Sequence, residues 1–310
     1  FAQTGCTAQV DILRQYHSVS GFVDPYNEFG CLKNGYSFGG ILINSINKFE
    51  LPNKHEMRLY LNGNKILNKN KDFSLDLYLG VMRRLASQVG DGYEELTDKA
   101  LNVLPENLQS LSFEDLFKVV KQSFNIWING ICRLMPEAHW KDEIQSETPR
   151  ILGLKNDPTG AMPMLTGLYP NGSISSAIIR DPRDTNMDFN RHYGLGHSEE
   201  TVKRQCTIYN SQIKSCVSQI KKYREKFEGR FFVIEFERLI KSKDYRDRYI
   251  EKMIGKRKQV RECFYQDRSS ENINLYKNYD PKLVNIVENE CITNYEHFLV
   301  FLDNENLLFS

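Results

Sequence analysis

One short segment combines an apolar strand with charges that suit an anion. Residues 177–180 read Ala-Ile-Ile-Arg, and Asp-Pro-Arg-Asp follows at 181–184. The apolar run predicts a buried strand, the proline predicts a turn, and a helix is expected to begin near Asp184. Arg180 would then lie at the carboxyl end of the strand, where open α/β folds bind ligands and where a guanidinium suits a phosphate. The alternative is a turn in which the two arginines form ion pairs with the two aspartates.

Two more segments place polar groups where an anion can bind. The turn at residues 4–7, Thr-Gly-Cys-Thr, precedes apolar residues whose spacing predicts a short helix over 8–16. Backbone N–H groups and the helix dipole would point at an anion there, and an ordinary helix cap is the alternative. Lys155 follows a short apolar run and precedes a proline turn, so it can stabilise developing charge or simply extend into solvent at a strand end.

Taken in order, these segments resemble the sulfotransferases that use 3′-phosphoadenylyl sulfate (PAPS), in particular the carbohydrate and bacterial types. In that family an apolar strand runs into Arg-Asp-Pro-Arg-Asp, and its arginine grips the 3′-phosphate of the donor. A glycine-containing turn cradles the 5′-phosphosulfate, and a lysine lies beside the sulfuryl group. The resemblance implies sulfuryl transfer from PAPS to a hydroxyl or amine, with 3′-phosphoadenosine 5′-phosphate (PAP) as the product and no metal.

The resemblance also implies roles for individual residues. Glu28, in the segment 23–29, would be the general base, with Asp24 in reserve; a solvated surface glutamate is the alternative. Lys155 would stabilise the leaving oxygen, and Asp157 would contact the acceptor. The donor would be bound by Gln3, Thr4, Gly5, Cys6, Thr7, Arg180, Asp188, Arg268, Ser269 and Ser270.

Two positions depart from the family pattern. Gln3 stands where a lysine or arginine is usual, and Asp188 stands where a serine normally shares the 3′-phosphate with Arg180. A carboxylate would repel phosphate, so Asn186 or Arg191 is a candidate to take its place. These departures favour an alternative function, a nucleotide-binding or scaffold protein of the same fold without catalysis. A P-loop kinase is less favoured, because the turn lacks the lysine of Gly-Lys-Ser/Thr.

The elements expected to position these residues alternate between strands and helices. Apolar residues at helical spacing over 73–104 and 113–135 predict a helical block, and we expect the segment 73–150 to form the acceptor side. Further along the chain, buried strands are expected at 151–154, 176–179 and 231–236, and helices at 198–228 and 281–302. Strands separated by helices imply a parallel sheet. The predicted fold is α/β, a three-layer α/β/α domain over residues 1–310 with a central parallel sheet like that of P-loop NTPases.

Composition excludes several classes of protein. Lys and Arg number 41 and Asp and Glu 40, so no whole-chain field attracts nucleic acid. No apolar run is long enough to span a membrane, and the seven scattered cysteines show no Cys-x-x-Cys pair, which favours reduced thiols over a zinc site. We therefore expect a cytoplasmic protein that acts on a small-molecule or glycan acceptor, with a homodimer as one open oligomeric state. The sequence leaves open whether a targeting segment lies upstream of residue 1.

Overall fold

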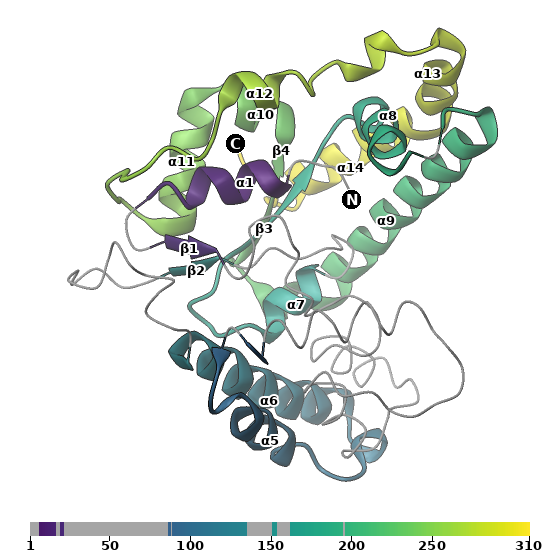
Figure 1. Ribbon diagram of the computed structural model, residues 1–310. Helices are drawn as coiled ribbons and strands as arrows, with labels where there is room; N and C mark the ends of the chain where they lie inside the picture. Colours follow the sequence, from purple (N-terminus) through teal and green to yellow (C-terminus); the bar gives the residue numbers. More distant parts are fainter. Residues whose placement is uncertain are drawn as a thin grey trace. The chain divides into compact units, whose positions relative to one another are not determined.

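The computed structural model describes residues 6–16, 19–21, 86–87, 89–134, 151–153, 162–194 and 196–310 (Figure 1). These residues are mostly helical and include two two-stranded sheets, β1–β2 and β3–β4. The chain divides into two compact units. The first comprises Phe1–Val19, Pro158–Thr166 and Ser173–Ser310, and the second comprises Ser20–Asp157 and Gly167–Gly172. The single domain predicted over 1–310 stays a prediction.

A parallel strand pair forms the centre of the first unit. β3 (Ser175–Ile179) pairs with β4 (Phe231–Glu235) in register from Ser175 opposite Phe231 to Ile179 opposite Glu235. The apolar residues of both strands are buried, as expected for strands covered on both faces. Parallel strands need a long crossover, and here the helices α8 (Pro182–Tyr193) and α9 (Glu199–Phe227) provide it. The strands predicted at 176–179 and 231–236 and their helical connection are therefore present, which gives this part of the chain α/β character. The strand predicted at 151–154 belongs to a separate two-stranded sheet.

A second partner lies along β4. The Val233 N–H donates to the Leu307 carbonyl at 2.7 Å, and the Phe309 N–H donates to the Val233 carbonyl at 2.8 Å. The Phe309 ring packs against the rings of Phe232 and Tyr245, with centroids 5.3 and 5.1 Å away. Sequence analysis did not predict this third extended segment.

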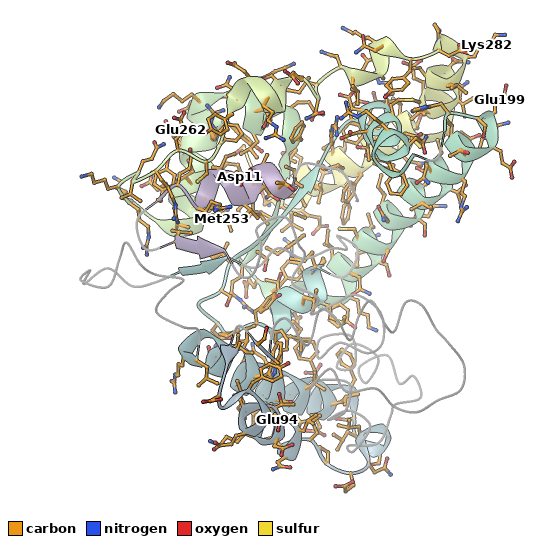
Figure 2. The ribbon with its side chains drawn as sticks, viewed as in Figure 1. Asp11, Glu94, Glu199, Met253, Glu262 and Lys282 are labelled. Carbon is orange, nitrogen blue, oxygen red and sulfur yellow. The ribbon has the colours of Figure 1, made fainter. Side chains whose placement is uncertain are left out.

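The long helix α9 follows directly from its sequence. Ser198 caps its first turn by accepting a hydrogen bond from the Thr201 N–H at 3.2 Å. Figure 2 shows Glu199 at the start of this helix and Lys282 on a later one, with both side chains projecting outward. The inner stripe of α9 is buried at helical spacing and comprises Val202, Cys206, Tyr209, Ile213, Cys216, Ile220, Tyr223 and Phe227. The helix predicted over 198–228 is confirmed.

The predicted C-terminal helix contains a wide turn. Residues Pro281–Val287 form α13, Glu288–Ile292 form a π-helical turn, and Thr293–Asn304 form α14. Such turns insert one residue into an α-helix and re-aim its side chains. The helix expected over 281–302 is therefore present, with a local change of pitch that the hydrophobic spacing did not indicate.

Shorter elements complete the first unit. On α1 (Cys6–Leu13), the Gln9 side chain donates to Ser176 Oγ at 3.0 Å and to the Tyr249 hydroxyl at 3.3 Å. These bonds attach α1 to β3 and to α11, and the helix predicted over 8–16 is confirmed in part. The remaining elements are α7 (Met162–Leu168), α10 (Phe236–Lys241), α11 (Lys243–Ile254), α12 (Gln266–Ser270) and the 3₁₀ turn Leu275–Asn278.

In the second unit, two helices pack closely. Gly130 faces Leu96 at a distance that leaves no room for a Cβ atom, and Ser123 Oγ donates to the Ala100 carbonyl at 2.7 Å. The predicted helix over 113–135 is confirmed as α6, and the helical prediction for 73–104 is confirmed where that segment is described. The elements are α5 (Tyr93–Asn102), the 3₁₀ turn Leu108–Ser110, α6 (Phe113–Leu134) and β2 (Ile151–Gly153), which pairs with β1 (Val19–Gly21).

In the part of the chain described above, every helix is too short or too polar to cross a membrane.

Candidate functional site

The turn after β3 has a well-defined local cause. Asp181 caps α8, its carboxylate accepting a hydrogen bond from the Arg183 N–H at 2.9 Å. Pro182 occupies the first helical turn, where its missing N–H costs nothing. The helix thus begins two residues earlier than Asp184, where it was expected. Arg180 is left at the junction, directly after the last strand residue.

Arg180 lies at the centre of a polar cluster. Its side chain is 1% exposed, and its Nη1 donates to Asp188 Oδ2 at 2.8 Å. Its Nη2 donates to the Asn272 carbonyl, and the guanidinium lies 5.1 Å from the centre of the Phe236 ring. Arg191 Nη2 donates to Asp188 Oδ1 at 2.6 Å and to Asn272 Oδ1 at 3.1 Å. We call Arg180, Asp188, Arg191 and Asn272 the Arg180 cluster.

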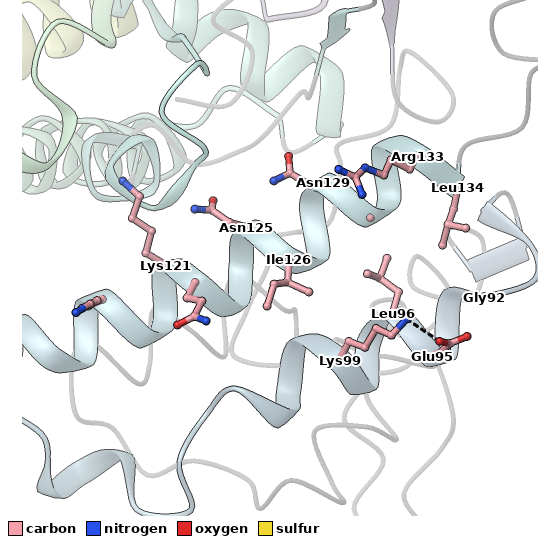
Figure 3. Close-up of a pocket in the computed structure, with 13 residues that line it drawn as sticks. Gly92, Glu95, Leu96, Lys99, Lys121, Asn125, Ile126, Asn129, Arg133 and Leu134 are labelled. Carbon is pink, nitrogen blue, oxygen red and sulfur yellow. Dashed lines mark ion pairs between the residues drawn. The ribbon is translucent and has the colours of Figure 1, made fainter.

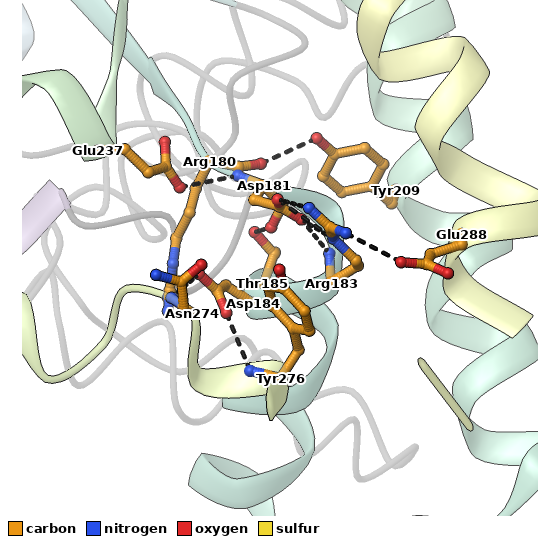
Figure 4. Close-up of polar contacts among 10 residues, drawn as sticks. All are labelled: Arg180, Asp181, Arg183, Asp184, Thr185, Tyr209, Glu237, Asn274, Tyr276 and Glu288. Atoms are coloured by element: carbon orange, nitrogen blue, oxygen red, sulfur yellow. Dashed lines mark hydrogen bonds and ion pairs between the residues drawn. The ribbon is translucent and has the colours of Figure 1, made fainter. Parts of the chain in front are cut away.

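The second arginine of the motif has a different set of partners (Figure 4). Arg183 Nη2 donates to Asp181 Oδ2 at 2.6 Å, and its Nη1 donates to Glu288 Oε1 at 2.9 Å. The guanidinium lies 4.2 Å from the centre of the Tyr276 ring. The hydrogen bond with Asp181 is the main cause that raises the pKa of Arg183. The ion pair between the second arginine and the first aspartate, one form of the alternative considered from sequence, is therefore present.

Asp184 joins the turn to a distant segment. Its carboxylate is 1% exposed and accepts hydrogen bonds from the backbone N–H groups of Asn274 at 2.8 Å and Tyr276 at 3.1 Å (Figure 4). Burial raises the pKa of this carboxyl, and the two N–H donors and Arg180 oppose the rise. On the other side, the Tyr209 hydroxyl donates to the Arg180 carbonyl at 3.1 Å. The backbone around Arg180 is thus held from both sides.

Glu237 supports the same turn from α10. Its Oε1 accepts a hydrogen bond from the Asp181 N–H at 3.1 Å. Burial raises the pKa of Glu237 above its ordinary value of 4.5, the hydrogen bond lowers it, and the nearby Asp181 carboxylate raises it further. The folded state therefore keeps this proton over a pH range in which the unfolded chain has lost it.

We expect Glu237→Gln to remove a pH-dependent loss of stability. The stability associated with Glu237 is fully present below its ordinary pKa and is lost as the pH rises through the raised folded pKa. A glutamine keeps an oxygen that accepts from the Asp181 N–H but carries no charge to desolvate. Urea unfolding between about pH 5 and 8 should show the variant gaining free energy of unfolding relative to the original protein. If the difference in free energy of unfolding between the variant and the original protein stays constant across this pH range, the raised pKa of Glu237 is contradicted.

The structure accounts for part of the predicted site. Cys6 and Thr7 are the first residues of α1, and Arg268, Ser269 and Ser270 belong to α12. Arg180 and Asp188, predicted eight positions apart on one phosphate subsite, contact each other directly. Seven residues lie outside the described ranges: Gln3, Thr4, Gly5, Asp24, Glu28, Lys155 and Asp157.

One substitute named for the missing serine is wrong. The Asn186 amide is buried and donates to the Val202 carbonyl at 3.2 Å and to Cys206 Sγ at 3.5 Å. It therefore faces α9 and contributes to helix packing. Arg191, the other substitute, does join the cluster through Asp188.

Asn272 is the residue that sequence reasoning missed. It contacts Arg180 through its backbone carbonyl and Arg191 through its side chain. Its position two residues after Ser270, one of the residues assigned to the donor, was the available signal. A backbone acceptor carries no residue-type signature, so the contact with Arg180 had none.

Comparison with known proteins adds no further information. No family model, no curated protein and no solved structure matches the chain. The chemistry of the site therefore rests on its own residues. Two guanidinium groups share one carboxylate in the Arg180 cluster, and the buried carboxyl groups of Asp184 and Glu237 also interact with Arg180. The guanidinium groups are the part of the site suited to a phosphate. Among the described residues, no group of three or more His, Cys, Asp or Glu side chains is arranged to hold a metal.

The second unit contains a separate groove between α5 and α6, with a volume of about 800 Å³ (Figure 3). Figure 3 shows Lys121, Asn125, Asn129 and Arg133 along one edge of α6, and Leu134 on the side of the helix that faces α5. Four cations and one carboxylate line the groove, so it favours a negatively charged ligand. The charged lining residues are Lys99, Lys118, Lys121, Arg133 and Glu95.

Proposed function

We propose that the protein is a sulfotransferase that transfers a sulfuryl group from PAPS to an acceptor hydroxyl or amine. The observation that carries this proposal is the position of Arg180. It follows a parallel strand and meets the loop after α12, 92 residues further along the chain. The resemblance assigns the 3′-phosphate of the donor to Arg180, and it assigns donor binding to Arg268, Ser269 and Ser270, which directly precede this loop. Arg191 adds a second cation at this point.

The proposed mechanism uses this chain's residues as follows. Backbone N–H groups at Thr4 to Thr7 hold the 5′-phosphosulfate, and Arg180 contacts the 3′-phosphate. Glu28 takes the acceptor proton while the acceptor oxygen attacks sulfur and the bond from sulfur to the bridging oxygen of PAP breaks. Lys155 stabilises the charge that develops on this leaving oxygen. The three-layer sheet of the P-loop type is part of the same proposal.

The helical segment 73–150 stays the predicted acceptor side, and the proposed acceptor is a small molecule or a glycan. A homodimer and a cytoplasmic location stay predictions.

A second function has one observation in its favour. Asp188 forms an ion pair with Arg180, as it would in a protein that retained the fold and lost the chemistry. Such a protein binds a nucleotide without turning over PAPS. Binding and turnover must therefore be measured separately.

The direct test is calorimetric titration with PAP, the inert donor product. We expect a dissociation constant on the order of micromolar. Arg268→Ala should weaken binding by about tenfold or more, because a hydrogen bond to a charged group contributes roughly 1.5–3 kcal/mol and tenfold corresponds to about 1.4 kcal/mol. Arg204→Ala is the matched control, since Arg204 is exposed on α9 and belongs to no segment assigned to the donor. Absence of binding by a sample that is folded by circular dichroism would overturn the proposed function.

A further inference from the structure

We infer that Asp188 sets the nucleotide selectivity of the Arg180 cluster. Its carboxylate occupies the position on Arg180 that a 3′-phosphate would take. The protein therefore binds nucleotides with and without a 3′-phosphate with similar affinity. This inference rests on the proposed function and concerns the same site.

The geometry of Asp188 leaves little room for a second anion on Arg180. One carboxylate oxygen accepts from Arg180 Nη1 at 2.8 Å, and the other accepts from Arg191 Nη2 at 2.6 Å. The Asp188 side chain is 11% exposed and that of Arg180 1%. The Asn272 carbonyl accepts a hydrogen bond from Arg180 Nη2. A phosphate that approaches Nη1 from the side of Asp188 must displace this carboxylate.

The charge of Asp188 also disfavours a phosphate beside Arg180. The two arginines attract an anion, but Asp188 cancels one of their charges and repels a phosphate placed beside it. A serine at this position would donate to the phosphate instead, and the site would keep both positive charges. A like charge placed against one ligand and not another is a recognised source of selectivity.

A ribose 3′-hydroxyl, unlike a 3′-phosphate, is compatible with an aspartate at position 188. An aspartate accepts a hydrogen bond from a ribose hydroxyl, as acidic residues do in dinucleotide-binding folds, where an arginine instead accommodates the phosphate. A nucleotide with a free 3′-hydroxyl therefore loses nothing at Asp188. The Asp188 carboxylate therefore weakens the binding of a nucleotide with a 3′-phosphate and does not weaken the binding of one with a free 3′-hydroxyl.

The experiment compares PAP with adenosine 5′-monophosphate, which lacks the 3′-phosphate, by calorimetry. In the original protein we expect the two affinities to agree within about threefold. Asp188→Ser should raise the affinity for PAP by about tenfold or more and change that for adenosine 5′-monophosphate by less than about threefold, since tenfold corresponds to roughly 1.4 kcal/mol. Asp188→Asn should act in the same direction, and its side-chain oxygen keeps an acceptor for Arg180 if the serine variant fails to fold.

Asp303→Asn is the control for net charge, because Asp303 is exposed on α14. A preference of the original protein for PAP above about thirtyfold would overturn the inference without any variant. Unchanged selectivity in both Asp188 variants, or an equal gain for both nucleotides, would also overturn it, and the proposed function would stand. If neither nucleotide binds any folded form, the proposed function falls as well.

Discussion

Replacing Arg180 with alanine is expected to lower the free energy of unfolding by about 3 kcal/mol, the low end of the range for breaking a buried ion pair. The change removes a guanidinium that is 1% exposed and leaves Asp188 with Arg191 as its remaining cation. It also leaves the Asn272 carbonyl without its donor. Urea unfolding followed by circular dichroism measures the loss.

The double variant Arg180→Ala/Asp188→Ala separates the ion pair from other effects. With both side chains removed, no buried carboxylate is left without its Arg180 partner, so the double variant should lose less stability than the sum of the single ones. We expect a coupling free energy of about 1–3 kcal/mol. Additivity within about 0.5 kcal/mol would mean that the two side chains do not form a coupled pair in solution.

Glu28→Gln is expected to reduce sulfuryl transfer by about two orders of magnitude or more, because general-base catalysis contributes roughly 10² to 10⁴. The amide retains the shape of the side chain and cannot take a proton, so the affinity for PAP should be unchanged. The measurement is the initial rate with labelled PAPS and an acceptor that the original protein turns over, chosen from a panel of phenols, alcohols and glycans. PAP titration of the variant supplies the binding control.

Asp24→Asn distinguishes the two candidate bases. Full transfer activity in Glu28→Gln together with a large loss in Asp24→Asn would move the role to Asp24. Full activity in both variants would remove general-base catalysis by this segment from the mechanism.

Local patterns account for the elements that were predicted correctly. The helix α9 has a serine cap and a buried stripe at helical spacing, and both signals lie within its own sequence. β3 and β4 are short apolar runs bounded by polar residues. The extended segment at 307–309 was missed because its pairing with Val233 joins residues that are distant in the chain. The π-helical turn was missed because it changes helical pitch without changing the type of residue.

The contacts of the candidate site also divide into local ones, which the sequence indicates, and ones that depend on the packing of separate elements. The contact between Arg183 and Asp181 spans two residues, and it was among the ion pairs considered from sequence alone. The contacts of Arg180 with Asp188 and Asn272 depend on how α8 and the loop after α12 pack. The departure at position 188 was visible in the sequence. Only the structure shows its consequence, which is that the Asp188 carboxylate binds the arginine that was expected to bind phosphate.

The segment at 307–309 also protects the chain against aggregation. β4 is an apolar strand, Phe-Phe-Val-Ile-Glu, and such a strand with a free edge is a template for pairing with other molecules. Residues 307–309 take up the hydrogen-bonding groups of Val233, and Phe309 covers the aromatic rings beside it. In the part of the chain that the structure describes, two backbone hydrogen bonds join residues 307–309 to β4, and the Tyr245 hydroxyl donates to the Phe309 carbonyl at 3.1 Å. Substitutions that loosen this segment would therefore expose the edge of β4 at Val233 to other molecules.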